Sequence, residues 1–144
     1  MEQQISTENN KIKLDFKEST YATGRRKKSI AKVWIKKGSG KIFINGKDFN
    51  NYFSNENHKM QIVKPFETIN QISDYDVKCN VTGGGHTGQA GAVVHGIAKA
   101  LLLINSEFKA ALKKEKLTTR DSRSVERKKP GRKKARRSFQ FSKR

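Results

Sequence analysis

Hydrophobic residues are most regularly spaced between residues 81 and 104, where a β-branched run leads into three glycines and a helical pattern follows them. On a wheel of about 100° per residue, the apolar positions of this helix share one sector roughly 120° wide: Ala90, Val93, Val94, Ile97, Ala100, Leu101 and Ile104. The opposite stripe consists of Gly88, Ala92, His95 and Lys99. We therefore expect one face to dock on a core and the small, cationic face to stay open.

The glycines place a helix N-terminus where no side chains shield it. Such an N-terminus presents free N–H groups and the positive end of the helix dipole, an arrangement that suits a phosphate. The pattern indicates a phosphate site at this turn. It leaves open whether the phosphate belongs to a nucleotide or to a nucleic acid.

Residues 20–44 show the alternation of strands separated by tight turns. In residues 29–36, Ala31, Val33 and Ile35 share one face, whereas the other face carries Ile30, Lys32, Trp34 and Lys36. A short strand over residues 41–44 ends at Asn45-Gly46, and residues 77–82 form the strand before the glycines. Trp34, on the lysine-bearing face, is either partly core or a platform on which a base stacks.

Short helices are expected between these strands. Asp48 is placed to cap one that runs to residue 53, and Asn57 caps another over residues 58–63. Pro65 is expected to end that helix and begin the next, over residues 66–72. The residues expected to face the sheet are Met60, Ile62, Val63, Phe66, Ile69 and Ile72. A last helix restarts at residues 105–107 and would cover Leu102 and Leu103.

Charge narrows the function. The 144 residues carry a formal net charge of +19, from 32 Lys and Arg against 13 Asp and Glu. Residues 120–144 alone hold twelve of these cations and two acids. Such a field favours polyanions, and nucleic acid above all. The cationic run at a turn between strands favours a phosphate contact over a merely solvated surface; it comprises Arg25, Arg26, Lys27 and Lys28.

From residue 113 onward apolar residues nearly vanish, and Val125 is the one sizeable aliphatic residue of residues 118–144. A segment that buries so little is expected to be disordered until it runs along a polyanion. Phe139 and Phe141 would be anchors in a groove or stacking platforms. The chain thus divides into a flexible extension (1–18), with or without a function, a globular domain (19–117) and an extended basic tail (118–144).

Gly83, Gly85 and Gly88 match the GxGxxG pattern of dinucleotide-binding sites. Glu107 follows 24 residues after Gly83, near the position of the acid in that pattern. The dinucleotide fingerprint also requires a second strand after the helix, with the acid at its end. Glu107 instead lies in another helical run. No Lys-Ser or Lys-Thr pair follows the glycines at the P-loop spacing. We therefore expect no cofactor and no small-molecule substrate.

Other classes are disfavoured as well. The three histidines, His58, His86 and His95, lack metal-ligand spacing, and no GxSxG elbow occurs, so an enzyme is not expected. Cys79 is the single cysteine, and it is interpreted as a core residue, with a reactive thiol as the alternative. No run approaches the length of a membrane span and no apolar signal core begins the chain, which predicts a cytoplasmic protein without a membrane partner.

Residues 83–101, GGGHTGQAGAVVHGIAKAL, strongly resemble the signature of the small-subunit ribosomal protein S-nine family in its bacterial branch. YATGRRKKSIAKVWI (21–35), TRDSRSVERKKPGRKKAR (119–136) and the final QFSKR resemble it too. The resemblance covers about residues 19–144. It implies an α+β fold: a four-stranded sheet with helices packed on one face and a left-handed βαβ crossover, as in the ribosomal and elongation-factor domain superfamily, against the usual right-handed rule.

The resemblance also implies a structural constituent of the small ribosomal subunit that binds small-subunit rRNA in the head, the 3′ major domain. Its tail would reach the P site, where Lys143 and Arg144 contact the anticodon stem-loop of P-site tRNA. Neighbouring ribosomal proteins of the head would be further partners. The residues expected on rRNA are Arg25, Arg26, Lys27, Lys28, Gly83, Gly84, Gly85, Gly88, Gln89, His95, Lys99, Arg120, Arg123, Arg127, Lys128, Lys129, Arg132, Lys133, Lys134, Arg136 and Arg137.

The chain departs from the family pattern at two places. Val94 stands where bacterial relatives often carry Arg, so one phosphate contact is expected to be missing. Ser138-Phe139 replaces an Arg-Pro pair, which is expected to change the course of the tail. Two other function classes remain open: a free nucleic-acid chaperone or histone-like DNA binder, which the tail permits, and a nucleotide-dependent enzyme that uses the glycine turn.

Overall fold

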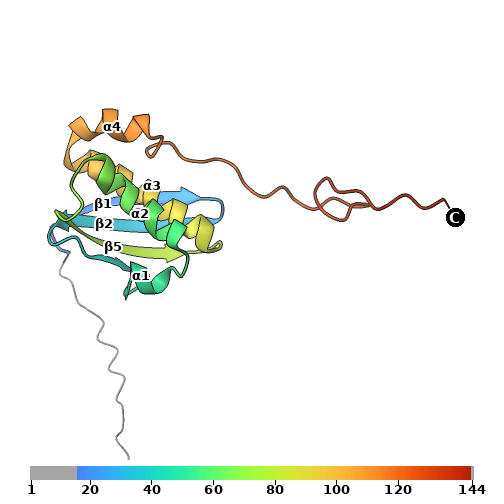
Figure 1. The fold of residues 1–144 in the computed structure, drawn as a ribbon, viewed down its shortest axis with the longest axis horizontal. Coiled ribbons are helices and arrows are strands. Elements are labelled where there is room, and N and C mark those ends of the chain that lie inside the picture. The colour runs from blue at the N-terminus through green and yellow to red at the C-terminus, as the bar shows by residue number, and fades with distance from the viewer. Residues whose placement is uncertain (1–15, 144) are drawn as a thin grey trace, which may run out of the picture.

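The structure, a computed structural model, describes residues 16–143; the predicted extension before residue 16 and the terminal Arg144 lie outside this range. A domain of strands and helices is followed by a long tail that runs away from it (Figure 1). Its elements are β1 (Thr20–Arg26), β2 (Ser29–Lys37), β3 (Ile42–Ile44), β4 (Lys47–Asp48), α1 (Phe49–Tyr52), α2 (Glu56–Thr68), β5 (Tyr75–Thr82), α3 (His86–Ile104), η1 (Ser106–Phe108, a 3₁₀ turn) and α4 (Lys109–Lys114).

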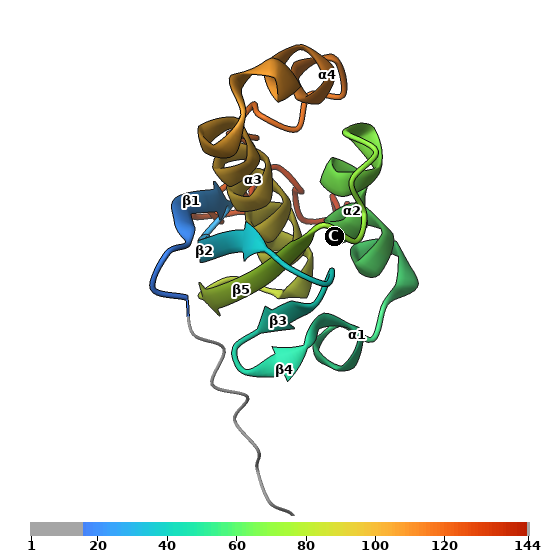
Figure 2. The same cartoon turned by 90° about the vertical axis from the view of Figure 1, so that its left-hand side faces the viewer.

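The strands form one mixed sheet in the order β1-β2-β5-β3-β4. β2 pairs antiparallel with both β1 and β5, whereas β3 lies parallel to β5. The chain between the parallel strands passes through α1 and α2, which makes a βαβ unit (Figure 2). The predicted α+β class is confirmed, and the left-handed sense of the crossover stays a prediction.

The sheet has five strands, so the predicted count of four is wrong. Asn45 and Gly46 take positive φ angles of 51° and 81°, which suit a two-residue hairpin turn. Ile44 therefore pairs with Lys47 across the turn, and β4 is added at the edge. A strand of two residues carries no alternation by which it could be predicted. Asp48 then caps α1 as predicted, accepting from a first-turn N–H at 3.3 Å.

The core lies between the sheet and the helices that pack on one of its sides. Ala31, Val33 and Ile35 of β2 are fully buried, as their alternation predicts. The predicted apolar sector of α3 covers them, with the following residues fully buried: Ala90, Val93, Ile97, Ala100 and Leu101. Burial of these two apolar surfaces against each other is the main energy that holds the domain together. Cys79 lies in this core, where burial raises the pKa of its thiol.

α3 is long and apolar enough, by length and composition, to cross a membrane. The expectation that no segment approaches that length is therefore wrong. Half of the helix is nevertheless buried inside the domain, because the sheet covers one side of it and α2 packs against it as well. This is the composition of a core helix that is apolar nearly all round.

α2 is one uninterrupted helix, which corrects the prediction of two helices separated at Pro65. Its cap is the side chain of Asn55 rather than Asn57. Pro65 is fully buried, so core packing offsets the helical hydrogen bond that its missing N–H forfeits. Met60 and Ile72, predicted to face the sheet, are 69% and 56% exposed. The continuous helix turns Met60 outward, and Ile72 lies beyond its end.

The helix predicted after α3 is present as η1 and α4. Leu112 of α4 is fully buried against the core. Leu102 is partly covered, but Leu103 remains 67% exposed. The predicted cover of Leu103 is therefore wrong.

α3 approaches β1 more closely than any side chain would allow. A Cβ added to Gly24 would lie 1.9 Å from the carbonyl oxygen of Ala92 and 2.3 Å from the nitrogen of Gly96. A Cβ on Gly96 would lie 2.5 Å from a methyl group of Val33. Backbone atoms cannot move aside by a change of rotamer, so glycine is required where helix and strand cross.

Asp76 holds the turn between β2 and β3. Its Oδ1 accepts from the N–H groups of Ser39 and Lys41 at 2.8 and 3.0 Å and from the Ser39 hydroxyl at 3.3 Å. The residue is 7% exposed. Burial alone would raise the pKa of Asp76, but the hydrogen bonds from Lys41 and Ser39 outweigh burial and lower it. Gly38 provides the room, since a Cβ there would lie 2.0 Å from this carboxylate.

Asp76→Ala should lower the free energy of unfolding by about 2–3 kcal/mol at pH 7, because hydrogen bonds to a charged group are worth about 1.5–3 kcal/mol. The folded pKa of Asp76 is lowered. Its contribution is therefore fully present above the unfolded pKa of about 4 and is lost as the pH falls through the folded pKa. Urea unfolding should show the difference from the natural chain narrowing in acid. Asp74→Ala, at an exposed position, is the matched control, and an equal effect there would contradict the assignment.

Gly24→Ala should cost about 3 kcal/mol or more of unfolding free energy, because the new methyl group overpacks against backbone. Thermal unfolding followed by circular dichroism measures the loss. Gly85→Ala controls for the removal of a glycine, since nothing lies within 4 Å of the Cβ it would add. Equal midpoints for the two variants would show that the close approach does not hold.

Candidate nucleic-acid interface

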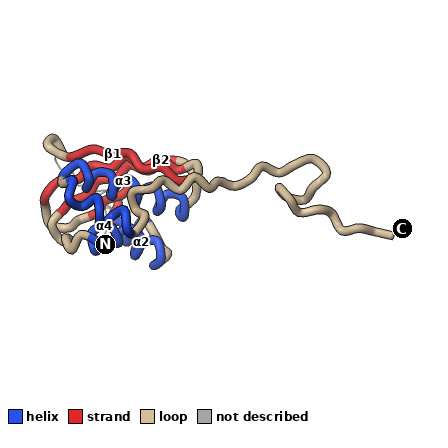
Figure 3. The backbone as a smooth tube through the Cα atoms, turned by 90° about the horizontal axis from the view of Figure 1, so that it is seen from above, coloured by secondary structure: helices blue, strands red, loops and turns tan. Residues whose placement is uncertain are grey.

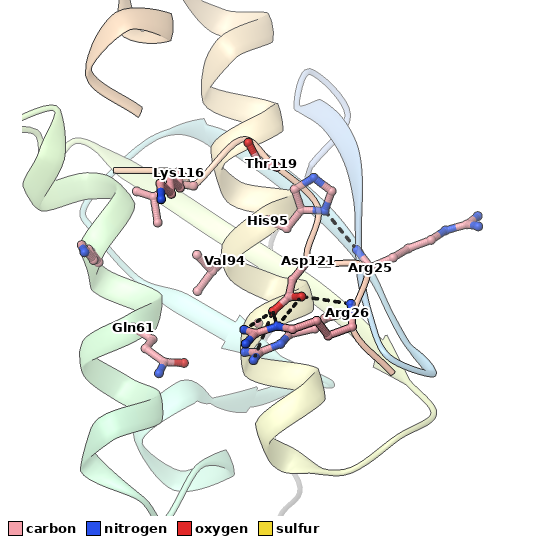
Figure 4. Close-up of a pocket in the computed structure, with 12 residues that line it drawn as sticks. Arg25, Arg26, Gln61, Val94, His95, Lys116, Thr119 and Asp121 are labelled. Carbon is pink, nitrogen blue, oxygen red and sulfur yellow. Dashed lines mark hydrogen bonds and ion pairs between the residues drawn. The ribbon is translucent and has the colours of Figure 1, made fainter. Parts of the chain in front are cut away.

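An open cleft of about 340 Å³ lies where the β1–β2 turn, α2, α3 and the segment after α4 meet (Figure 4). Cationic residues dominate its lining, and one carboxylate lies among them. The charged residues are Arg26, Lys64, Lys116, Arg123 and Asp121; Arg25 lines the cleft as well, but its side chain points away from it (Figure 4). Several cations around one concavity raise the local positive potential and attract an anion.

Arg26 reaches into this cleft across α3 (Figure 4). Its aliphatic carbons occupy the space beside Gly91, where a Cβ would lie 2.2 Å from Cδ of Arg26. One guanidinium nitrogen lies 3.6 Å from Asp121. Nε of Arg26 is buried and has no partner among the described residues. Buried donors are nearly always paired in folded proteins, so the described residues leave this donor unsatisfied.

Asp121 organises the cations at the start of the tail. Its carboxylate accepts from the backbone N–H of Arg123 at 3.0 Å and from the guanidinium of Arg123 at 2.8 Å. These bonds, with a smaller effect of the Arg26 charge, hold the pKa of Asp121 well below its usual range. The ionised carboxylate therefore links the β1–β2 turn to the segment that follows α4.

The cations of the β1–β2 turn are divided between two sides of the domain. Arg25 and Arg26 are neighbours at the end of β1, and successive strand residues point to opposite faces. Figure 4 accordingly shows Arg25 directed away from the cleft. Lys27 and Lys28 form the loop itself, with Lys27 at a φ of 52°, where L residues are uncommon. The run therefore does not act as one patch.

The glycine turn serves the fold at two positions and stays open at the third. Gly83 and Gly84 have φ angles of +73° and +61°, and added Cβ atoms would lie 2.5 Å from the Lys28 carbonyl and 2.1 Å from the Ser29 hydroxyl, respectively. They allow the β1–β2 turn to pack against the start of α3. Gly85 caps α3 without a side-chain bond and has nothing within 4 Å of an added Cβ. The first turn of α3 therefore keeps the free N–H groups that bind anions.

Gln89 supports this turn from within the protein. Its amide donates to the Gly83 carbonyl at 3.1 Å and accepts from the Tyr52 hydroxyl at 2.9 Å. The ring of Tyr52 also meets His86 edge to face, with centroids 5.8 Å apart. These contacts fix the direction in which α3 begins.

The stripe of α3 expected to stay open packs instead along the outer edge of β1. Gly88 and Ala92 are buried there. Lys99 donates from Nζ to the Thr23 carbonyl at 3.1 Å. The outward N–H and C=O groups of an edge strand can otherwise pair with a strand of another chain. This stripe therefore protects the edge of the sheet.

His95 joins α3 to β1 and to the root of the tail. Its Nδ1 accepts from the Arg25 N–H at 3.3 Å, and its ring also bonds the backbone of Thr118. Burial, followed by the positive charge of Lys99, lowers the pKa of His95 despite the opposing bond to Thr118. A neutral ring leaves Nδ1 free to accept, so His95 helps set where the tail leaves the domain.

The described tail, residues 118–143, contains no helix or strand and runs away from the domain (Figure 3). Glu126 pairs with Lys129 at 2.8 Å and with Arg136 at 2.9 Å. The Arg132 guanidinium donates to the Arg136 carbonyl and to the Ser138 hydroxyl, both at 2.9 Å. These bonds close a loop within the tail. The disorder expected of the isolated tail stays a prediction.

The tail cations predicted to contact rRNA are exposed throughout its described part. They are Arg120, Arg123, Arg127, Lys128, Lys129, Arg132, Lys133, Lys134, Arg136 and Arg137, and Lys143 is exposed as well. Phe139 and Phe141 are 61% and 88% exposed, which leaves both interpretations of them open. The structure thus brings Arg26, His95 and Arg123 together at the cleft and leaves the distal cations along the tail.

Two cations of the cleft were not singled out by the sequence. Lys64 lies on α2 and forms an ion pair with Glu115 at 2.9 Å, which lowers the pKa of Glu115. Lys116 follows α4. No local pattern links the two lysines, because only the packing of α4 beside α2 brings their segments together. Val94 also lines the cleft, so an Arg at this position would face the same concavity.

Metal ligands are not grouped in the described part of the chain: no cluster of three His, Cys, Asp or Glu residues fits an ion.

Comparison with known proteins gives two findings. Residues 24–144 match the family described as Ribosomal protein S9/S16. The protein named Small ribosomal subunit protein uS9 from Cytophaga hutchinsonii is 54% identical over 123 residues, which are 85% of this chain and 96% of that relative. The family match includes the β1–β2 turn, the glycine turn, α3 and the tail. The chain therefore belongs to the ribosomal protein S9/S16 family.

Proposed function

We propose that the protein is a structural, non-enzymatic constituent of the small ribosomal subunit and binds its rRNA. The name of the 54% identical relative supports the choice of subunit. The observation that carries the proposal is a cation-lined cleft that leads directly into an exposed basic tail. A domain seated on folded RNA with a tail beside it neutralises many phosphates together, and the release of counter-ions supplies much of the affinity.

The cleft and the start of α3 are two seats for the RNA backbone. Arg26 and Arg123 carry planar guanidinium groups, which bind phosphate with two hydrogen bonds at once. Gly85 lets a phosphate approach the N–H groups of α3 without a side chain in the way. Arg26 and the start of α3 belong to the packed domain, so little ordering entropy opposes their contacts with RNA.

The tail extends the reach of the domain. Twenty-seven extended residues span at most about 90 Å, several times the radius of about 13 Å expected for a domain of this size. We place the domain in the head of the subunit, on the 3′ major domain of the rRNA and beside other ribosomal proteins. The tail would then end at the P site, with Lys143 and Arg144 against the anticodon stem-loop of the tRNA.

We propose further that the tail is disordered before it meets RNA. Its loop is held by the ion pairs of Glu126 with Lys129 and Arg136 and by the hydrogen bonds of Arg132, and all of these side chains are exposed. Exposed pairs contribute little to stability because solvent screens them, and this is too little to order a segment that loses conformational entropy at every residue that is fixed. Phosphates would replace Glu126 as the partner of these cations.

Replacing Lys133, Lys134 and Arg137 together with Ala should flatten the salt dependence of rRNA binding. Each lost phosphate contact should reduce the slope of log K against log salt by about 0.7–0.9, or about 2–3 in all. Binding of a small-subunit rRNA fragment over a range of salt concentrations measures this slope. The matched control replaces three exposed lysines of β4 and α4, Lys47, Lys109 and Lys113. Equal slopes for the two triple variants would show that the tail is not a phosphate clamp.

Deleting residues 141–144 should leave assembly nearly intact and weaken P-site tRNA binding, because the domain and most tail cations remain. Sedimentation of cell extract at physiological salt should show the full and the shortened chain with small subunits. Lys143→Ala with Arg144→Ala separates the role of charge from that of length. A free or DNA-bound pool of the full chain would refute the ribosomal proposal. Unchanged tRNA affinity of truncated subunits would refute the P-site role alone.

A further inference from the structure

Aromatic side chains gather on the side of the sheet opposite α2 and α3. In the strand register, Tyr21 lies opposite Trp34, Trp34 opposite Lys78, and Lys78 opposite Phe43. Residues directly opposite each other project from the same face of a sheet. These four side chains therefore form one row across four strands. The rings of Tyr21 and Trp34 have centroids 5.3 Å apart and are tilted by 42°.

This aromatic row is open to a partner. Tyr21 is 45% exposed, and Trp34 and Phe43 are partly exposed. A further ring, Phe16, comes from the segment before β1. The ammonium group of Lys78 lies 5.8 Å from the centroid of Phe16, so Phe16 extends the aromatic surface beside the row.

Cations border the row. By strand alternation the same face carries Arg25, Lys32, Lys36 and Lys78. The acids in register with it are Asp76 and Asp48. Both are engaged within the protein, since Asp76 holds the turn after β2 and Asp48 caps α1. The charge that this face offers to a partner is therefore positive.

Rings interleaved with lysines on a sheet suit single-stranded RNA. Unpaired bases stack on aromatic side chains, and each such contact is worth about 1–3 kcal/mol, while the flanking phosphates meet the cations. Duplex RNA keeps its base faces inside the helix and cannot stack in this way. A protein partner fits less well, because the cores of protein interfaces are depleted of charged residues.

We propose that this face is a second RNA-contact surface, which stacks an unpaired base on Trp34 and Tyr21 and binds the adjoining phosphates through Lys32 and Lys78. The surface lies on the opposite side of the sheet from the packed helices. This proposal rests on the proposed function only in the choice of RNA as the partner.

Trp34 is the single tryptophan of the chain, so its fluorescence reports on this face alone. The full chain is titrated with a short single-stranded RNA, with duplex RNA of equal length and with inorganic polyphosphate. All three should bind the basic tail, but only the single strand should quench Trp34 emission. Trp34→Leu should weaken single-strand binding about tenfold, within the range of about 5- to 150-fold that 1–3 kcal/mol represents.

Companion variants separate stacking from folding and from charge. Trp34→Phe keeps a ring and should retain the affinity. Tyr21→Leu changes an exposed side chain, should leave the fold intact and should also weaken single-strand binding. Lys64→Ala with Lys116→Ala, in the cleft, should lower affinity for all three ligands without altering the quench.

Single-stranded RNA that binds without changing Trp34 emission would overturn the proposal. The same holds if Tyr21→Leu and Trp34→Leu bind it as tightly as the natural chain. Loss of a neighbouring protein from subunits that carry Trp34→Leu, with RNA affinity unchanged, would assign this face to a protein contact instead. The fluorescence and affinity titrations do not depend on whether the chain enters small subunits, so their failure is distinct from failure of the proposed function.

Discussion

Backbone meets backbone where α3 crosses β1, and the arrangement of the rest of the surface depends on that contact. Gly24 and Gly96 remove the two Cβ atoms that would hold helix and strand apart. The helix can then lie low enough for His95 and Lys99 to bond the outer edge of β1. An edge strand is closed to other chains in this way, and the same approach brings the β1–β2 turn beside the glycine turn of α3.

The cleft follows from this geometry together with the root of the tail. Arg26 crosses α3 toward Asp121, and His95 bonds Thr118, so the first tail residues are held against the domain. Farther along, the tail makes bonds mainly with itself. The root of the tail is thus fixed on the domain, and its exposed, cationic continuation gives a long reach. In the proposed function, ordering the cleft would cost little entropy on RNA binding and ordering the tail would cost more.

Local chemistry predicted some elements well and others poorly. The predictions of α3 from its 3.6-residue period and of β2 from its alternation were correct, because each element buries one face against the same core. Pro65 misled the prediction, since its burial in the core outweighs a lost helical bond. β4 was not predicted, because a strand of two residues shows no alternation. Asn45-Gly46 nevertheless marked the turn that brings β4 against β3. At the candidate site, the sequence identified the cationic turn, the glycines and the tail, but not Lys64 or Lys116.

The sequence by itself determined the strongly basic character of the chain, the core faces of α3 and β2, the high density of cations in the tail and the family signature, because these depend on residue types at short spacing. Only the tertiary structure decided that Gly83 and Gly84 allow close packing, whereas the space beside Gly85 stays open. It also decided that the polar stripe of α3 seals β1, and that cations from α2 and from the segment after α4 share a cleft with Arg26. The reason is that these outcomes depend on contacts between residues far apart in the chain, whose distances no local period encodes.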